Sequence, residues 1–357
     1  MLTDSPSCGY DHVYVTVDHV EISSDGNFWT AMPVSASLGR IDLLSLNNGA
    51  LISLGQTPLG AGTYQQVRLV LAANGNTAPY ANSVVLTGSA TEIALTTPSG
   101  QQSGYKIVGP FTIAAGTMAD LVLDFNACKS IVVAGASGQY LLKPVVSAVA
   151  ELVAGKITGT TVAGSHVYAE QRSTSGPDVV TGTVADATTG AFTLWPLPET
   201  PVPVDVVIVP PPPSSGTAGY ASYIVQNVPV TAGATTNLGM MTTLAPSSVY
   251  AVSGAVTVAG SAGAADLVAE QLVTSSGRTY EIASTSTTSG PYSIPLASAG
   301  PWLGTYSTTL PLVFAQDMAG SDVGVYGVTA TDAAGSSASH LVNVSTGPAA
   351  VDFILSP

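Results

Sequence analysis

Short stretches of alternating apolar and polar residues recur along the chain, and this period of two predicts β-strands. In residues 13–22 the apolar positions change from odd to even numbers halfway along, which predicts a bulge near Asp18 and His19. Residues 121–125 form a second clear strand, followed by a polar break and a cysteine. Turns rich in Gly, Pro, Asn and Asp separate such stretches, and no long window has helical periodicity. The pattern therefore predicts an all-β protein.

The C-terminal part of the chain contains an internal repeat. Residues 167–171 (Val-Tyr-Ala-Glu-Gln) align with residues 267–271 (Leu-Val-Ala-Glu-Gln), an offset of 100 positions. At the same offset, and without a gap, residues 189–194 align with residues 289–294. Two copies of one strand-rich unit are therefore expected here.

A second similarity lies upstream in each copy, where residues 156–159 resemble residues 251–254 and both end in Gly. A period of about 100 residues with many short strands is the size of an immunoglobulin-like sandwich. The first 152 residues have several strands of their own and no such repeat. We predict three consecutive β-sandwich modules, at residues 1–152, 153–247 and 248–357.

The composition limits the classes of partner. Only 8% of the residues are charged, against about 25% in typical soluble domains, so uncharged side chains must form most of the surface. The net charge is −14, from 22 acidic and 8 basic residues, and the basic residues are scattered. This balance argues against binding to nucleic acid and to anionic membrane surfaces. We expect neither partner and no cofactor.

The chain has two cysteines, Cys8 and Cys128. In a β-protein poor in Lys and rich in Thr and Ser, we predict that they form one structural disulfide in an oxidising compartment. The alternative is two buried free thiols in a cytosolic protein. No apolar run is long enough to span a membrane, and the first six residues lack a basic and apolar leader. We expect an exported protein whose signal peptide is absent from this chain.

The N-terminal module contains a combination of short motifs, at residues 2–4, 8–11, 42–46, 61–64, 97–104, 124–130 and 142–145. Together they resemble a family of bacterial exported proteins, the domain of unknown function 4382. The resemblance covers residues 2–152 and implies an exported all-β domain without a known activity. Asn126 stands where an acidic residue is expected, which weakens the case for a metal site in its loop.

The repeat resembles carboxypeptidase-regulatory or transthyretin-like sandwich modules, which also occur in bacterial surface stalks. The order of its motifs carries this resemblance: a strand ending in Gly, then a Val-x-Ala-Glu type strand, then Gly-x-aromatic-x-apolar. In such stalks a Lys and an Asn can form an intramolecular isopeptide bond beside an acid. The first copy offers Lys156, Glu170 and Asn237 in that order, whereas the second copy has no Lys.

The sequence contains no recognisable catalytic or metal-binding motif. There is no Gly-x-Ser-x-Gly elbow, no His-x-x-x-His and no Cys-x-x-Cys, so we predict a protein that is not an enzyme and has no metal site. Calcium held between loop acids stays open as an alternative. The histidines are best interpreted as satisfied or exposed side chains. They are His12, His19, His166 and His340, and the loop acids are Asp178, Asp186, Asp317 and Asp322.

These observations favour a non-catalytic structural or adhesive protein of the bacterial cell surface or matrix, with a self-assembling filament subunit as the more specific version. The alternative is an extracellular module that binds carbohydrate or, with calcium, another ligand. For carbohydrate, aromatic residues would provide a stacking platform, although filling sandwich cores is their commoner use. The C-terminal strand, with Val351, Phe353 and Leu355 on one face, would complete its own sandwich or that of a neighbour. The aromatic residues are Trp195, Tyr220, Tyr223, Trp302 and Tyr306.

Overall fold

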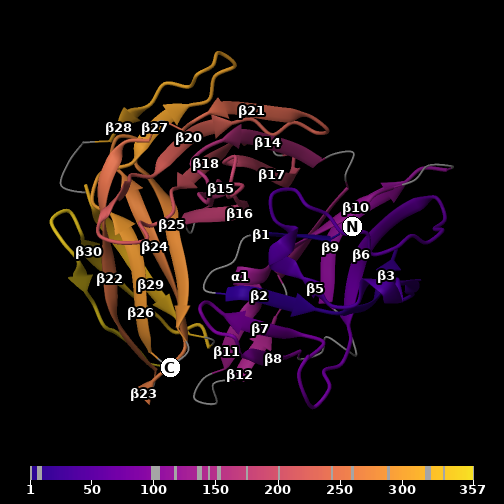
Figure 1. The fold of residues 1–357 in the computed structure, drawn as a ribbon. Helices are drawn as coiled ribbons and strands as arrows, with labels where there is room; N and C mark the ends of the chain where they lie inside the picture. Colours follow the sequence, from indigo (N-terminus) through magenta and orange to yellow (C-terminus); the bar gives the residue numbers. More distant parts are fainter. Residues whose placement is uncertain are drawn as a thin grey trace. The chain divides into compact units, whose positions relative to one another are not determined.

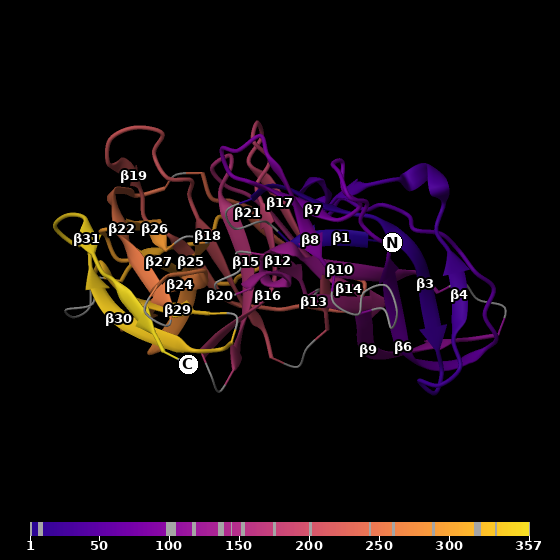
Figure 2. The same cartoon turned by 90° about the horizontal axis from the view of Figure 1, so that it is seen from below.

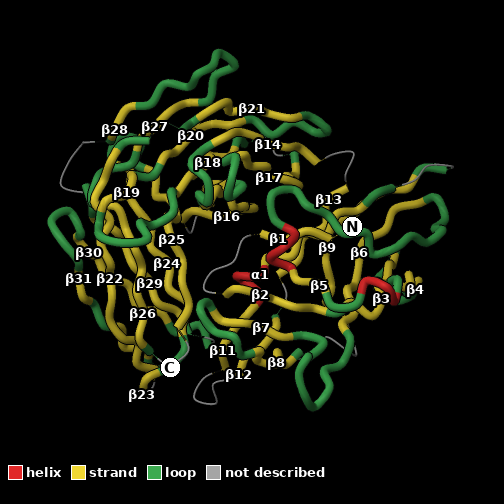
Figure 3. The backbone as a smooth tube through the Cα atoms, viewed as in Figure 1, coloured by secondary structure: helices red, strands yellow, loops and turns green. Residues whose placement is uncertain are grey.

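In the part of the chain that it describes, the computed structural model consists mainly of strands and the loops between them, with one four-residue α-helix and two short 3-10 helices (Figure 3). The predicted all-β class is confirmed. The chain divides into two compact units, the first mainly residues 1–155 and the second mainly residues 156–357 (Figure 1). The structure describes residues 2–5, 10–97, 105–115, 119–134, 139–143, 145–150, 154–173, 176–199, 202–242, 244–258, 261–287, 290–317, 323–332 and 334–356.

The N-terminal part of the chain forms three sheets, with strand orders β11-β12-β8-β7-β2-β5, β4-β3-β6-β9 and β1-β10-β13. Its helices are η1 (Ala36–Leu38), η2 (Leu43–Leu46) and α1 (Ala127–Ser130). Its strands are β1 (Leu2–Ser5), β2 (Tyr10–Val15), β3 (Val17–Ser23), β4 (Thr30–Pro33), β5 (Ile41–Asp42), β6 (Gly62–Leu71), β7 (Ser83–Leu86), β8 (Glu92–Thr96), β9 (Tyr105–Ile113), β10 (Leu121–Asn126), β11 (Ile131–Ala134), β12 (Gln139–Leu142) and β13 (Val145–Ala150).

The first long alternating stretch is two strands rather than one. Thr16 separates β2 from β3, and the two strands belong to different sheets. The pairing of β3 with β6 shifts register between Val17 and His19, so the predicted bulge is confirmed. The change of phase in the sequence thus records the bulge, whereas the passage of the chain from one sheet to the next at Thr16 leaves the apolar phase unchanged.

The second unit contains both copies of the repeat. The first copy begins with a three-stranded sheet, β17-β14-β21, and a six-stranded sheet, β16-β15-β18-β20-β27-β28, which we call the middle sheet. Its strands are β14 (Ala154–Thr160), β15 (His166–Ser173), β16 (Gly176–Val184), β17 (Ala191–Pro198), β18 (Val204–Val209), β19 (Ala218–Tyr220), β20 (Tyr223–Val228) and β21 (Thr235–Met240).

The second copy has a sheet centred on its long first strand, β22, which pairs with β19, β23, β26, β31 and β32. Opposite it lies a four-stranded sheet, β25-β24-β29-β30, which we call the outer sheet. The strands are β22 (Pro246–Val258), β23 (Ser261–Ala262), β24 (Ala265–Val273), β25 (Arg278–Thr287), β26 (Pro291–Ala297), β27 (Trp302–Thr305), β28 (Ala315–Gln316), β29 (Val325–Thr331), β30 (Ser337–Asn343), β31 (Ala349–Ala350) and β32 (Phe353–Leu355).

The two copies have the same local construction. The pairing of β15 with β16 shifts register between Ala169 and Glu170, and the pairing of β24 with β25 shifts between Ala269 and Glu270. Each copy also closes with a C-terminal strand that runs parallel to its first strand, β21 beside β14 and β32 beside β22. The aligned motifs therefore mark equivalent backbone positions, and in both copies the strand facing the motif bulges at the same point, at Val180 and at Ile282.

The middle sheet is shared between the copies. β20 of the first copy pairs in parallel with β27 of the second, with Tyr223 opposite Trp302. Val207 and Ile224 on this sheet belong to the same core cluster as residues of the second copy, including Val252 and Phe353. Because side chains alternate between the faces of a strand, the middle sheet is covered on both faces, which suits the nearly continuous apolar run of β18.

The division of the chain into three modules stays a prediction. The boundary expected after residue 152 falls within residues 151–153, outside the described part of the chain. The boundary expected after residue 247 falls inside β22, close to its start. Both copies of the repeat lie in one compact unit.

Candidate functional site

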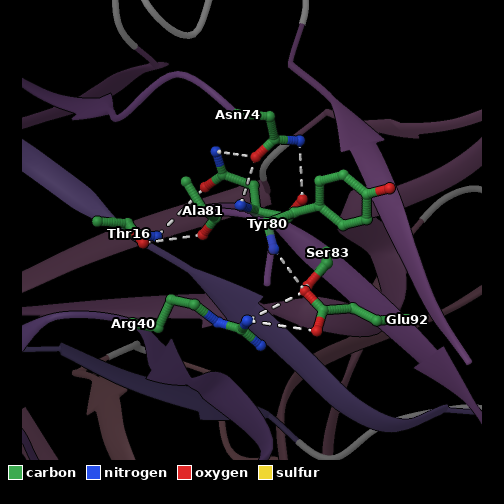
Figure 4. A network of polar contacts seen from close by, with 8 residues as sticks. Thr16, Arg40, Asn74, Tyr80, Ala81, Ser83 and Glu92 are labelled. Carbon is green, nitrogen blue, oxygen red and sulfur yellow. Dashed lines mark hydrogen bonds and ion pairs between the residues drawn. The ribbon is translucent and has the colours of Figure 1, made fainter. Parts of the chain in front are cut away.

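A network of partly buried polar groups in the N-terminal unit is centred on Glu92 of β8 (Figure 4). Its carboxylate accepts hydrogen bonds from Arg40 Nη1 at 3.0 Å, Ser83 Oγ at 2.8 Å and the Tyr80 amide at 2.8 Å. Burial raises the pKa of Glu92, but the hydrogen bonds from Ser83 and Tyr80 and the charge of Arg40 outweigh it, and the pKa is lowered. An ionised carboxylate with three donors holds the loop before β7 in place.

The same network continues through two asparagines that hold the chain where it changes sheets. Asn82 Oδ1 accepts from the Thr16 amide at 3.2 Å, and Asn82 Nδ2 donates to the Ala72 carbonyl at 2.8 Å. Asn74 in turn accepts from the Asn82 amide at 2.6 Å and donates to the Leu95 carbonyl at 3.0 Å. These contacts replace strand pairing at the break between β2 and β3, so the network has a structural use.

The four histidines lie on strands of four different sheets. His12 on β2 contacts Asp42 at 2.7 Å, and His19 on β3 contacts Asp18 at 2.7 Å. Burial lowers the pKa of His166, and His340 packs its ring against Phe353, with 5.2 Å between centroids. The histidines are thus satisfied by different neighbours, and the structure brings no two of them together into one site.

A cavity of about 160 Å³ lies between the two copies of the repeat, and we call it the inter-repeat cavity. Strands β15, β16 and β18 of the first copy and β25 of the second copy contribute to it. Its lining residues are Glu170, Gln171, Gly176, Pro177, Asp205, Gly277, Arg278, Thr279 and Tyr280.

Asp205 is the polar centre of this cavity and links the two copies. Its carboxylate accepts from Arg278 Nη1 at 2.7 Å and from the Tyr280 hydroxyl at 2.9 Å, both on β25, and from the Asn227 amide at 2.8 Å. Burial and the charge of Asp205 raise the pKa of Tyr280 to about 12. The side chain of Arg278 is 28% exposed and that of Asp205 13%. The ion pair is therefore shielded from much of the solvent and fixes the two sheets to each other.

Glu170 is the least accommodated group at the cavity. The residue is 3% exposed, its Oε2 accepts from the Glu281 amide at 3.3 Å, and its Oε1 has no hydrogen-bond partner among the described residues. Burial, with the nearby charge of Glu281, raises the pKa of Glu170 well above its ordinary value. Burial of the carboxylate is costly, so Glu170 keeps its proton to a higher pH than an exposed glutamate does.

The residues considered for an isopeptide bond lie in different surroundings. Lys156 on β14 lies over the ring of Trp195, with Nζ 5.4 Å from the ring centroid. Asn237 on β21 is exposed and its side chain accepts from the Gly239 amide at 2.8 Å. Glu170 belongs to a different sheet, the middle sheet, and lines the inter-repeat cavity. The order of Lys156, Glu170 and Asn237 in the sequence did not indicate that Glu170 lies on a different sheet from the other two.

The loop acids considered as calcium ligands do not form a cluster among the described residues, where no group of three or more His, Cys, Asp or Glu is arranged to hold a metal ion. Asp186 caps its own hairpin turn, accepting from the Thr189 amide at 2.7 Å, and this hydrogen bond lowers its pKa. Asp178 lies on β16, and Asp317 is buried and accepts from the Ser275 amide at 3.5 Å. Asp322 lies outside the described residues.

The aromatic residues considered as a sugar platform are divided between the core and the surface. Tyr223 and Trp302 are opposite one another on β20 and β27 and stack with centroids 6.0 Å apart, and Tyr223 is buried. Trp195 and Tyr306 are half-buried, and Tyr220 is exposed. The largest aromatic cluster of this group therefore stabilises the shared sheet.

The predicted disulfide falls on residues that the structure does not describe in full, because Cys8 and the side chain of Cys128 lie outside the described part. The neighbouring strands are described. β1 pairs in parallel with β10, and Ser5 lies opposite Asn126. Cys8 follows Ser5 by three positions and Cys128 follows Asn126 by two. The disulfide stays a prediction.

The C-terminal strand is paired within its own chain. Phe353 lies opposite Val256 and Leu355 opposite Val258 on β22, and Phe353 and Leu355 are fully buried. Val351 is half-buried, and its amide donates to the Ser253 carbonyl at 2.9 Å. In this structure the strand completes its own sandwich, and a role in assembly stays a prediction.

A known protein family is similar to the N-terminal part of the chain. Residues 1–144 match the family model described as Domain of unknown function (DUF4382), which confirms the resemblance found in the sequence. No curated protein matches the chain. No helix among the described residues is long and apolar enough to cross a membrane.

Two solved structures have a weak likeness to the chain. A mutant of the shaft pilin spaA from Lactobacillus rhamnosus GG is 10% identical, with 57% of this chain and 98% of that chain covered and a TM-score of 0.18. A streptococcal ancillary pilin is 10% identical, with 100% of this chain and 98% of that chain covered and a TM-score of 0.17. Scores this low carry no argument about fold or function.

Proposed function

With residues 1–144 belonging to the DUF4382 family, we propose that this protein is a non-catalytic structural component of the bacterial cell surface or extracellular matrix that associates with copies of itself. The observation that carries the proposal is the shared middle sheet, in which β20 and β27 join the two copies of the repeat. Two sandwiches joined in this way resist bending better than two sandwiches on a linker, and stiffness is what a surface spacer requires.

The surface composition supports the self-association in this proposal. With 8% charged residues, most of the exposed groups are neutral. Neutral polar surfaces can be brought into contact without the large desolvation cost of charges. Because each copy has a net charge of −14, two copies repel each other. We therefore expect them to make contact through parts of the surface that lack acidic side chains.

An extracellular location is part of the proposal, and the described strand pairing supports the disulfide on which it partly depends. The parallel pairing of β1 with β10 places Ser5, three positions before Cys8, opposite Asn126, two positions before Cys128. Mass spectrometry of peptides from protein purified without reductant tests it. A linked pair is expected, and two alkylated thiols would remove this support for export.

The C-terminal strand is a candidate for exchange between copies, because β32 could pair with β22 of a neighbour in the same register. Cysteines at Thr257 and Ile354, which lie opposite one another on β22 and β32, separate the two arrangements. A disulfide within one chain means that the strand completes its own sandwich. A disulfide-linked dimer on a non-reducing gel means that it is exchanged.

The proposal as a whole is tested by sedimentation velocity over a concentration series together with negative-stain microscopy. Association that grows with concentration, and regular assemblies in the micrographs, are the expected results. Monomers at every concentration would overturn self-association. Turnover of any substrate that is lost when one Asp, Glu or His is replaced would overturn the non-catalytic part.

Binding of a small polar ligand is a second candidate function, favoured by the inter-repeat cavity with the ion pair of Asp205 and Arg278 at its wall. The thermal midpoint of the second unit in the presence of mono- and disaccharides, with and without calcium, measures it. A saturable rise that is lost in Asp205→Ala supports a site at the cavity. Unchanged midpoints across the panel would count against it.

A further inference from the structure

The outer sheet ends in a strand that is open on one side. Among the described residues, β30 pairs only with β29, in seven consecutive pairs without a register shift. Figure 2 shows β30 at the margin of the second unit, in yellow. Its outward backbone N–H and C=O groups alternate along an edge that another strand can join.

This edge lacks the protection that the other sheet edges have. The strands β4, β9, β16, β17 and β26 contain proline, and β21 pairs with β14 across a register shift. The strands β13 and β25 lie against other strands, and the remaining edge strands have four residues or fewer. Strand β30 is seven residues long and contains no proline, no bulge and no Asp, Glu, Lys or Arg. Among the described edges it is the long, regular one without a device against strand addition.

An exposed leucine marks the same strand. Leu341 is 82% exposed although it lies in the middle of a regular strand. Its cross-strand neighbour on β29 is Gly327, which has no side chain to cover it. On the opposite face His340 packs against Phe353, and Val342 is buried, so the strand is anchored to the core behind it. The edge is therefore held in place while its outer face stays uncovered.

We propose that β30 is the surface through which two copies of this chain associate, by antiparallel pairing of β30 with β30 about a two-fold axis at Leu341. This inference rests on the proposed self-association and assigns it to one strand. The register follows from the side chains. Pairing Leu341 with Leu341 keeps the inner and outer faces matched and sets two exposed apolar side chains opposite each other. It also places Ser339 opposite Asn343 and His340 opposite Val342.

Electrostatics favour a second copy as the occupant. The chain carries 22 acidic and 8 basic residues, so two copies repel each other over most of their surfaces. Strand β30 contributes no acidic side chain to the contact. In a two-fold pairing of β30, two chains with a net charge of −14 each would make contact through strands that carry no carboxylates. The outer sheets of the two copies would then form one continuous sheet.

The test compares Leu341→Lys with Val313→Lys, because Val313 is 85% exposed and lies outside the outer sheet. Both variants are expected to fold, since neither side chain is buried, and circular dichroism melting checks this. In sedimentation velocity, Leu341→Lys should weaken self-association at least tenfold, because two lysines would face each other across the axis. Val313→Lys should associate like the wild type.

A second variant tests the register. Leu341→Cys places two thiols directly opposite each other in the proposed dimer, at a separation that a disulfide can bridge. Under mild oxidation it should give a disulfide-linked dimer, whereas Ile354→Cys, which is also exposed, should not. Absence of the linked dimer, or equal association of Leu341→Lys and wild type, would overturn the assignment to β30 and leave self-association standing. A wild-type chain that stays monomeric would overturn self-association itself.

Discussion

The two copies of the repeat share their backbone plan and differ in what covers them. Glu170 and Glu270 occupy equivalent positions beside a bulge of the neighbouring strand, yet Glu170 is buried and Glu270 is half-buried. Glu170 lies on β15 of the middle sheet and lines the inter-repeat cavity, whereas Glu270 lies on β24 of the outer sheet and is not among the lining residues of that cavity. The same motif therefore places its glutamate in two different electrostatic environments, because the side chains packed around it differ between the copies.

The largest difference in stability between the two copies is expected from substitutions next to the closing strand. A methyl group on Gly254 would overlap the carbonyl oxygen of Val351, where β31 passes to β32. Gly254→Ala should therefore expel the closing strand and cost more than about 4 kcal/mol of unfolding free energy. The equivalent Gly159→Ala would bring a methyl group within 2.7 Å of the Phe192 ring and 3.2 Å of the Gly239 carbonyl oxygen, a milder overlap than at Gly254, and should cost about 1–3 kcal/mol.

Calorimetry of both variants measures this difference, with Gly347→Ala as the control. No atom lies within 4 Å of the added methyl group at Gly347, so the unfolding free energy of this variant should match that of the wild type within about 0.5 kcal/mol. Equal losses at Gly254 and Gly159 would contradict the different strand contacts described for the two copies.

The core behind the closing strand gives the next largest effect. Phe353 is fully buried between the rings of Tyr292 and His340, with centroids 5.8 and 5.2 Å away. Phe353→Ala should cost about 3–5 kcal/mol in urea unfolding, as is usual for a large cavity. Its neighbour Ile354 is 72% exposed, and Ile354→Ala should change the stability by less than about 0.5 kcal/mol. Similar losses for the two variants would mean that the strand does not complete its own sandwich.

The connection between the copies is tested by removing Asp205. Asp205→Ala leaves Arg278, the Tyr280 hydroxyl and the Asn227 amide without their acceptor, at an expected cost of about 1–3 kcal/mol. Glu199→Ala, at an exposed position, is the control and should be neutral. If the ion pair couples the copies, the calorimetric transition of Asp205→Ala should also broaden or divide, while an unchanged transition would place the coupling elsewhere.

The pH dependence of stability distinguishes Glu170 from Glu270. The informative quantity is whether the free energy of unfolding rises or falls with pH. Because the pKa of Glu170 is raised in the folded state, the folded chain holds a proton that the unfolded chain releases above about pH 4.3. This contribution is fully present below that pH and is lost as the pH rises through the raised pKa. Glu170→Gln should therefore flatten the decline in stability towards high pH.

Glu270→Gln is the matched variant, because burial also raises the pKa of Glu270 but the side chain is less enclosed. It should change the pH dependence in the same direction by a smaller amount. Denaturant unfolding of both variants from pH 4 to pH 9 provides the comparison. A larger effect at Glu270 would contradict the account of what covers the two copies.

Much of the fold could be read from the sequence. Alternation located most strands, and the repeat located the two equivalent copies, because each motif encodes a local strand, bulge or turn. The bulge at His19 was visible as a change of phase. The passage of the chain between sheets at Thr16 was not, since it depends on the distant side chain of Asn82.

The shared sheet and the inter-repeat cavity could not be predicted from the sequence, for a physical reason. The pairing of Tyr223 with Trp302 joins residues far apart in the chain and leaves no local periodicity. One signal was available: β18 reads Val-Asp-Val-Val-Ile-Val, a nearly continuous apolar run typical of a strand covered on both faces. Its single acid, Asp205, is the residue that pairs with the second copy, and nothing local indicates that partner.

Native-state hydrogen exchange of β20 and β27 tests most directly whether the two copies form one body. If the shared middle sheet joins them, peptides that contain residues 223–228 and 302–305 should exchange slowly, with the same free energy of opening as the core strands β18 and β29. Fast exchange in residues 302–305, or opening of the second copy while β18 stays protected, would contradict the joined unit and with it the stiff surface component proposed here.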